Sequence, residues 1–377
     1  MNRHNSSIDG VRATTLPGAR WTSTKQRQWV GAIIWLLTFS LGTALTQPAQ
    51  AAIPAAQRTV LITLYDNTNG SNWIDHDGWL GAPGTECSWY GIACDEAQTH
   101  VVSVDLEANN LVGGPIPSLT GLPDIEAFDV GENRLSGSLP TLAGLVNLRY
   151  FDASSNQLSG SIPLLTDLPG LQTFYVNDNR LTGAIPALAN LSRLANFQAS
   201  FNQLSGTIPP LTGLTQLAFF HVYNNQLTGM IPSLTGLIHL TSFDVGNNQL
   251  RGSTVPLTGL TNLQAFAIDA NQFSGEIPVV PEPDNLLEGQ SLLCPNQVNL
   301  TPSTDWDHAT SATPWYTACD LIFADGFKEP LHGSAQAPPV ACVRKTRRFG
   351  EVRLVACRAG ATQDCERTQR AQPSDFE

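Results

Sequence analysis

Residues 168–186 read LPGLQTFYVNDNRLTGAIP, and variants of this stretch recur along the chain. Its key asparagine, followed by any residue and then by leucine or phenylalanine, returns first after 24 residues and then every 23 residues. The series comprises Asn109, Asn133, Asn156, Asn179, Asn202, Asn225, Asn248 and Asn271, and a glycine lies four residues after each member. A unit repeated at this period predicts a solenoid, in which successive turns stack on one another.

Within each unit, apolar residues alternate over a short segment, as in Phe174 and Val176, which predicts a strand with one buried face. A phenylalanine occupies the same place in seven consecutive units and predicts a buried aromatic stack: Phe128, Phe151, Phe174, Phe197, Phe220, Phe243 and Phe266. The repeated asparagine amide is expected to hydrogen-bond the backbone of a tight turn, so that stacked copies form a ladder. The Ile-Pro pair should keep the return segment extended, because proline disfavours helix at the residue before it.

The segment LSGSIP at residues 158–163 resembles the plant-type leucine-rich repeats of receptor-kinase ectodomains and polygalacturonase-inhibiting proteins. Upstream, LITLY (61–65), NGSNW (69–73) and CSWYGIAC (87–94) are similar to the N-terminal cap of that family. The resemblance covers about residues 55–281. It implies an α/β leucine-rich-repeat horseshoe of about eight repeats, with parallel strands, 3-10 or extended return segments and a helical N-terminal cap. The unit here is 23 residues rather than the usual 24, and no kinase follows, so a receptor role is not implied.

Residues 1–51 are predicted to be a secretory signal peptide. Three basic residues (Arg20, Lys25 and Arg27) precede an apolar run over 29–45, and the small residues Ala49 and Ala51 favour cleavage before residue 52. An uncleaved single-span anchor is the alternative, although 17 residues are short for a bilayer core of ~30 Å. The expected location is secreted or cell-surface. A short motif at 322–327, IFADGF, is similar to one near the ends of some exported proteins of Gram-negative bacteria, which implies a secreted bacterial member.

The remaining segments are expected to be an N-terminal cap (52–100), the repeats (101–281), a C-terminal cap (282–327) and a strand-poor basic tail (328–377), for which disorder is one open alternative. Cysteines are absent from 95–293, which suggests that disulfides staple caps at the two ends of this segment, and the pairing of the three tail cysteines is left open. We predict the bridges Cys87–Cys94 and Cys294–Cys319. A redox role for the first pair is less favoured, because six residues separate the cysteines.

Charge excludes one class of partner. Residues 52–327 hold 6 basic and 25 acidic residues, and this balance would repel nucleic acid. The clusters Asp75-His76-Asp77 and Asp305-Trp306-Asp307-His308 could be metal or acid–base groups, yet neither has a partner at ligand spacing, and solvated turns explain them better. We therefore predict no enzyme activity, catalytic residue, metal or cofactor, and no membrane contact after signal cleavage. Sequons at Asn69, Asn190 and Asn299 matter only in a host that glycosylates them.

The open, concave face of the strands is the expected site of function. Its acidic residues cluster in the first two units and return in the seventh and eighth, whereas its aromatic residues gather in the third to sixth. The residues expected on this face are Asp105, Glu107, Asp129, Tyr150, Asp152, Tyr175, Asn177, Gln198, Phe201, Phe219, His221, Tyr223, Asp244 and Asp269. We predict that Tyr150, Tyr175, Phe201, Phe219, His221 and Tyr223 bind a protein, peptide or glycan. A polysaccharide-surface adhesin, an inhibitor of an extracellular enzyme and an enzyme with an unrecognised site are the alternatives. Strand propensity alone could also explain the aromatic residues.

Overall fold

The computed structural model describes residues 52–317, 342–348 and 351–357, and for the last two ranges it describes the backbone. The predicted signal segment, Cys319 and Cys365 lie outside these residues. No helix within the described residues is long and apolar enough to cross a bilayer.

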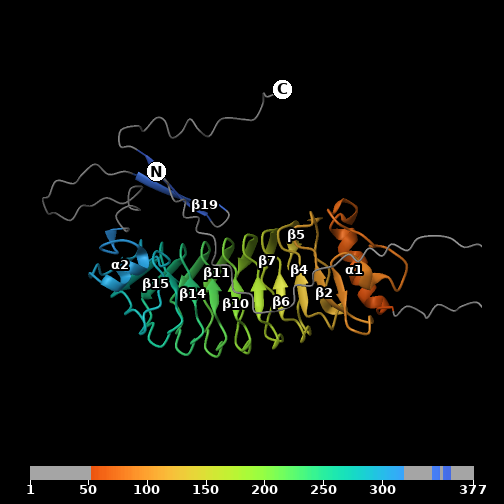
Figure 1. Cartoon of the computed structure of the whole chain (residues 1–377), viewed down its shortest axis with the longest axis horizontal. Helices are drawn as coiled ribbons and strands as arrows, with labels where there is room; N and C mark the ends of the chain where they lie inside the picture. The colour runs from red at the N-terminus through yellow and green to blue at the C-terminus, as the bar shows by residue number, and fades with distance from the viewer. Residues whose placement is uncertain (1–51, 318–341, 349–350, 358–377) are drawn as a thin grey trace, which may run out of the picture. The chain divides into compact units, whose positions relative to one another are not determined.

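Two sheets run along the repeats, and each unit contributes one strand to both (Figure 1). The first sheet contains β1 (Ile92–Cys94), β2 (Val101–Asp105), β4 (Ala127–Asp129), β6 (Tyr150–Asp152), β8 (Thr173–Tyr175), β10 (Asn196–Gln198), β12 (Phe219–His221), β14 (Ser242–Asp244) and β16 (Ala265–Ala267). The second contains β3 (Val112–Gly113), β5 (Arg134–Ser138), β7 (Gln157–Ser161), β9 (Arg180–Gly183), β11 (Gln203–Thr207), β13 (Gln226–Gly229), β15 (Gln249–Ser253), β17 (Gln272–Gly275) and β18 (Gln297–Val298). Only β1 pairs antiparallel among these described strands, so the predicted parallel solenoid is confirmed.

The phenylalanine stack lies in the core between the sheets. Its seven side chains are fully buried, and neighbouring rings are stacked with centroids 5.3–5.8 Å apart. The rings repeat in register because the strands pair residue for residue, as Phe174 does with Phe197. The leucines of the return segments close the other side, where a turn such as Leu142 to Leu145 is held by one i to i+3 hydrogen bond. Of these segments, Leu119–Gly121 forms the 3-10 helix η3.

The asparagine ladder is present and makes the hydrogen bonds that the sequence predicts. Asn179 Oδ1 accepts from the Leu158 N–H of the preceding turn at 2.8 Å. Its Nδ2 donates to the carbonyls of Ala153 at 2.9 Å, Val176 at 3.3 Å and Asn177 at 3.2 Å. One amide therefore satisfies backbone groups of its own turn and of the turn before it.

The ladder continues one step beyond the predicted repeats. Asn296 accepts from the Phe273 N–H at 3.0 Å and donates to the Ile268 carbonyl at 2.9 Å, while β18 pairs with β17. The C-terminal segment thus begins with a partial turn of the solenoid. The sequence prediction placed the whole segment in a C-terminal cap (282–327). The repeat pattern does not mark this turn, since Asn296 follows Asn271 by 25 residues and Val298 replaces the usual leucine.

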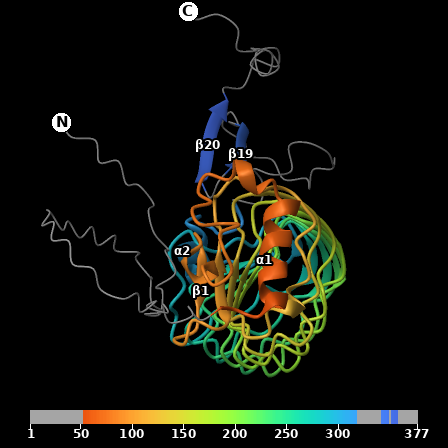
Figure 2. The same ribbon diagram turned by 90° about the vertical axis from the view of Figure 1, so that its right-hand side faces the viewer.

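Helices flank both ends of the stack. Helix α1 (Ala55–Asn67) lies against the first turn, where Gln57 Oε1 accepts from the Val101 N–H at 2.8 Å (Figure 2). The short helices η1 (Gly70–Asn72) and η2 (Glu86–Ser88) follow it. At the other end, Trp306 of α2 (Thr304–Thr310) packs against Phe266, and its indole N–H donates to the Pro278 carbonyl. Both ends of the apolar core are therefore covered.

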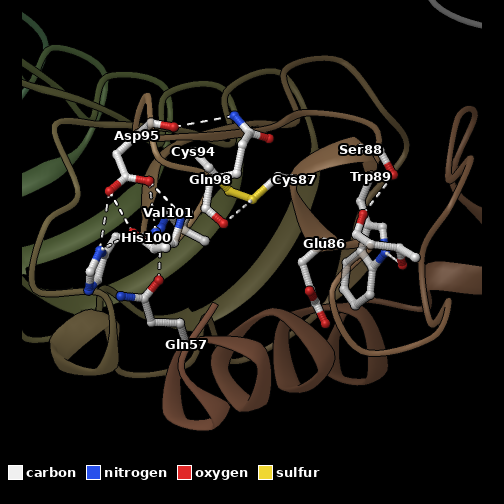
Figure 3. Close-up of a disulfide and its surroundings, with 12 residues drawn as sticks. Gln57, Glu86, Cys87, Ser88, Trp89, Cys94, Asp95, Gln98, His100 and Val101 are labelled. Atoms are coloured by element: carbon white, nitrogen blue, oxygen red, sulfur yellow. Dashed lines mark hydrogen bonds and ion pairs between the residues drawn. A yellow bond between two sulfur atoms is a disulfide. The ribbon is translucent and has the colours of Figure 1, made fainter. Parts of the chain in front are cut away.

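The N-terminal region contains the predicted disulfide between Cys87 and Cys94 (Figure 3). An ion pair between Arg58 and the buried Glu86 lies close to it, with the Arg58 guanidinium over the Trp89 ring. Cys294 is also disulfide-bonded. Because Cys319 lies outside the described residues, its pairing with Cys294 stays a prediction.

Removing the first bridge with a Cys87→Ala, Cys94→Ala double variant is expected to destabilise the protein. A loop of this length (sequence separation 7) restricts the unfolded chain by about 2 kcal/mol in the loop-entropy model. Urea denaturation of oxidised wild type and variant measures the difference. Equal midpoints would show that the bridge adds nothing to stability.

The tail contains strands where the sequence predicted few. Strands β19 (Cys342–Arg348) and β20 (Glu351–Cys357) pair antiparallel, with Cys342 opposite Cys357. The β-branched and apolar residues Val352, Leu354 and Val355 are the strand signal in this part of the tail.

Candidate ligand-binding face

The outward side of the first sheet, called here the strand face, is formed by three positions in each turn. They are the first and third residues of the short strand and the residue two places after it. Side chains two residues apart in a strand point the same way, and the strands are in register. Tyr175 therefore lies beside Gln198, which lies beside His221, which lies beside Asp244.

Aromatic side chains meet in pairs on this face, and all are half-buried. The ring centroids of Tyr150 and Tyr175 are 6.2 Å apart, and those of Phe219 and His221 are 6.1 Å apart. Tyr175 and His221 are two strands apart, or roughly 10 Å. One extended ligand could therefore contact both pairs.

The third pair is Phe201 with Tyr223, whose ring centroids are 4.9 Å apart. The sequence pattern placed Phe201 on the strand face, whereas the structure places it one residue beyond, in a turn with left-handed backbone (φ 53°). Asp178 and Asn224 hold the equivalent turn position in the neighbouring units. Phe201 reaches the face through its contact with Tyr223.

Carboxylates lie next to the tyrosine pair. The Asp129 Oδ1 and Asp152 Oδ1 atoms lie 3.3 and 3.1 Å from the point that a Cβ on Gly131 would occupy. Burial, and then the neighbouring Asp152 carboxylate, raises the pKa of Asp129 to about 7. The pKa of Asp152 is also raised, chiefly by burial. The ion pairs found within residues 52–317 include neither group.

The tyrosine hydroxyls stay protonated beside these carboxylates. Burial raises the pKa of Tyr175 to about 12, and the Asp152 charge adds to the effect. The pKa of Tyr150 is raised further, for the same reasons, and its hydroxyl donates to Asp152 Oδ2 at 3.2 Å. This end of the strand face thus offers negative charge and hydroxyl groups, and a cationic group would complement it.

His221 and Ser242 form a contact that resembles a base and a nucleophile. The His221 Nε2 and Ser242 Oγ atoms are 2.8 Å apart. Burial lowers the pKa of His221 to about 4, which leaves the ring neutral but makes it a poor match for removing a serine proton near pH 7. We interpret the contact as two polar groups that satisfy each other on a half-buried face.

The acidic clusters singled out in the sequence belong to turns and helix ends. The Asp75 N–H and carbonyl are both hydrogen-bonded to the side chain of Asn109, which links the N-terminal region to the ladder. Asp305 lies in the first turn of α2, where a negative charge is favourable. Within the described residues, no group of three or more His, Cys, Asp or Glu side chains could hold a metal ion.

Sequence reasoning missed one residue of this face. Ser200 lies two places after β10 and is 2% exposed, and its hydroxyl makes no hydrogen bond. No sequence pattern distinguishes it from Ser154 at the same position two units earlier. Its burial depends on the residues packed around it, and the sequence shows these only through the unusual phenylalanine that follows.

Comparison with known proteins agrees with this architecture. Residues 146–190 match the family model described as Leucine Rich repeats (2 copies). No curated protein matches the chain. The chain therefore contains leucine-rich repeats, and it folds as a leucine-rich-repeat solenoid.

Solved structures with a similar fold include two receptor ectodomains. The ectodomain of the Arabidopsis thaliana receptor kinase GASSHO1/SCHENGEN3, in complex with CASPARIAN STRIP INTEGRITY FACTOR 2, is 29% identical with a TM-score of 0.48. The match covers 64% of this chain and 36% of that one. The Arabidopsis HAESA ectodomain, in complex with an IDA peptide hormone, is 27% identical with a TM-score of 0.44, over 64% and 49% of the two chains. The chain thus spans between a third and a half of these proteins' lengths.

A third similar structure is a plant ice-binding protein, with 22% identity and a TM-score of 0.40. That match covers 65% of this chain and 97% of the ice-binding protein.

Proposed function

We propose that this protein is a secreted, non-catalytic binding protein whose strand face holds an extended polypeptide segment. One observation carries the proposal: three aromatic pairs share the face with the carboxylates of Asp129 and Asp152, which no ion pair within residues 52–317 includes. Half-buried aromatic rings on a rigid scaffold are typical anchors for a partner. The carboxylates favour a cationic partner, and polypeptides carry lysine and arginine where neutral glycans carry no charge.

The alternatives predict different ligands for the same face. A polysaccharide-surface adhesin would stack sugar rings on the tyrosines, and its binding would respond little to salt. An inhibitor of an extracellular enzyme would bind a folded partner rather than a short segment. Binding of a cationic segment should weaken as salt increases, because the carboxylates Asp129 and Asp152 would be screened.

The test begins with the full chain, immobilised and panned against a displayed library of random peptides about 12 residues long. We expect the enriched peptides to combine lysine or arginine with apolar residues. A glycan array is probed in parallel. Binding to glycans on the array, with no peptide enriched from the library, would support the adhesin alternative. Failure to enrich any peptide would contradict the proposal.

A Tyr175→Ala, Tyr223→Ala double variant should bind the enriched peptide at least about 30-fold more weakly, since each aromatic anchor contributes about 1 kcal/mol or more. Fluorescence anisotropy of the labelled peptide measures the loss. The matched control is a Leu164→Ala, Met230→Ala double variant, which removes exposed apolar surface outside the strand face. Wild-type affinity in the tyrosine variant, with an unchanged melting curve, would place the site elsewhere.

A further inference from the structure

The unpaired hydroxyl of Ser200 points to a feature of the strand face that the aromatic pairs alone do not reveal. The Ser200 backbone carbonyl is satisfied, because it accepts from the Asp178 N–H at 3.0 Å and from Asn202 Nδ2 at 3.2 Å. The side-chain oxygen is buried without a partner. Buried polar groups are nearly always hydrogen-bonded, so an exception needs an explanation.

The backbone directs this hydroxyl toward the strand face. Ala199, the residue before it, is fully buried in the core, and successive side chains of an extended segment point to opposite sides. Two units earlier, the equivalent Ser154 is partly exposed, and its hydroxyl donates to Asp152 Oδ1 at 2.6 Å. Ser200 therefore differs from its counterpart both in being covered and in lacking an acceptor.

Two aromatic residues adjoin Ser200 and can account for its burial. Phe201 is its neighbour in the chain, and Tyr223 occupies the same strand-face position in the next unit. The Phe201 N–H donates to the Tyr223 carbonyl at 3.0 Å, and their rings are in contact. Phe201 also adopts left-handed backbone, which is unfavourable for a bulky side chain. The same position is left-handed in the neighbouring units, at Asp178 and Asn224, so Phe201 differs from its counterparts in carrying a bulky ring on this turn.

We propose that the Ser200 hydroxyl is the polar floor of a ligand subsite, which the Phe201–Tyr223 ring pair covers in the free protein. When a ligand separates the rings, the hydroxyl gains the hydrogen bond that it lacks. The inference rests on the proposed function, because the occupant is part of the polypeptide held on the strand face. The hydroxyl both donates and accepts, so it suits a main-chain amide or a side-chain hydroxyl or amide. A charged group is disfavoured, because one hydroxyl cannot compensate for its lost hydration.

A double-mutant cycle tests, without any ligand, whether the Phe201 ring covers the Ser200 hydroxyl. Ser200→Ala should raise the melting temperature of the full chain, because the variant removes a buried unsatisfied group. Phe201→Asn keeps a residue that tolerates left-handed backbone, as Asn224 does, but removes the ring. In that background water reaches position 200, so Ser200→Ala should lose its benefit. The same effect in both backgrounds, or a lower melting temperature for Ser200→Ala alone, would overturn the proposal, since the hydroxyl would then be uncovered or already partnered.

The binding arm uses the most strongly enriched library peptide. Ser200→Ala should weaken its binding to the full chain five- to tenfold, the loss of about one buried neutral hydrogen bond. The same substitution at exposed Ser205 of β11 is the control and should change nothing. A peptide whose affinity depends on Tyr175 and Tyr223 but not on Ser200 overturns the subsite alone. A peptide indifferent to all three residues overturns the proposed function and the subsite together.

Discussion

Replacing Asn179 with leucine is expected to destabilise the solenoid by about 3 kcal/mol or more. Leucine is close to asparagine in size but can neither donate nor accept a hydrogen bond. The Leu158 N–H and the Ala153 carbonyl, which lie in the preceding turn, would lose their bonds to the side chain. Each buried backbone group left unpaired costs about 1–3 kcal/mol. Urea denaturation followed by circular dichroism measures the loss.

Asn177 provides the matched control, since it lies two residues away and carries the same side chain. Its amide donates to Asp178 on the exposed surface and makes no ladder bond. Asn177→Leu should therefore stay within about 0.5 kcal/mol of wild type. If the two variants had the same urea midpoint, the side-chain hydrogen bonds of the ladder would contribute no more to stability than hydrogen bonds to water do.

The ladder also explains why the sequence predicts the fold so well. A position that satisfies backbone groups in two turns must be filled in every unit, so its residue recurs at a fixed period. The same holds for the Phe174 and Phe197 positions, where each ring is in contact with the next. The fixed spacing of these residues in the sequence and their contacts between neighbouring turns therefore have the same physical cause.

The strand face is less predictable, because neighbouring units place no such constraint on it. Alternation within the strand identifies Tyr175 and His221 as outward-facing, and the structure places them in register. The left-handed turn at Phe201 recurs at Asp178 and Asn224 in the neighbouring units, so the repeat itself sets that backbone. Alternation does not reveal that Ser200 becomes buried, because its burial depends on side-chain contacts between turns. Residues that depart from the repeat are thus both the hardest to predict and the best candidates for a role specific to this protein.

Residues that differ from unit to unit also give the strand face two different charge environments. Half-buried Asp129 and buried Asp152 lie at one end, whereas His221 is held neutral near the middle. Their effects on stability oppose each other as the pH falls. The lowered pKa of His221, from 6.5 to about 4, makes protonation unfavourable in the folded state, so stability falls between these pH values. Protonation of Asp129 occurs more readily in the folded state, so it adds stability as the pH decreases below about 7.

Replacing Asp129 with asparagine is therefore expected to stabilise the protein by about 4 kcal/mol at pH 8, the equivalent of raising a pKa from 3.8 to about 7. The folded-state pKa of about 7 lies above the ordinary value of 3.8, so the folded state binds more protons between these values. The penalty for ionising the carboxyl is thus absent below pH 3.8, grows as the pH rises and is complete above about 7. Asparagine carries no charge at any pH, and its Oδ1 can still accept from the Gly131 N–H, as Asp129 does at 3.0 Å.

The measurement is urea denaturation of wild type and Asp129→Asn at pH 4 and pH 8. The gain should be large at pH 8 and nearly absent at pH 4, where Asp129 is protonated in the folded protein. Because His221 is common to both proteins, its titration cancels in the difference. Asp167→Asn removes an exposed carboxylate from a return segment and should change stability little at either pH. An equal gain at both pH values would mean that the substitution acts through packing. No gain in stability at pH 8 would mean that Asp129 ionises without penalty in the folded protein. The strand face would then lack the unfavourable carboxylate charge that a cationic partner would relieve.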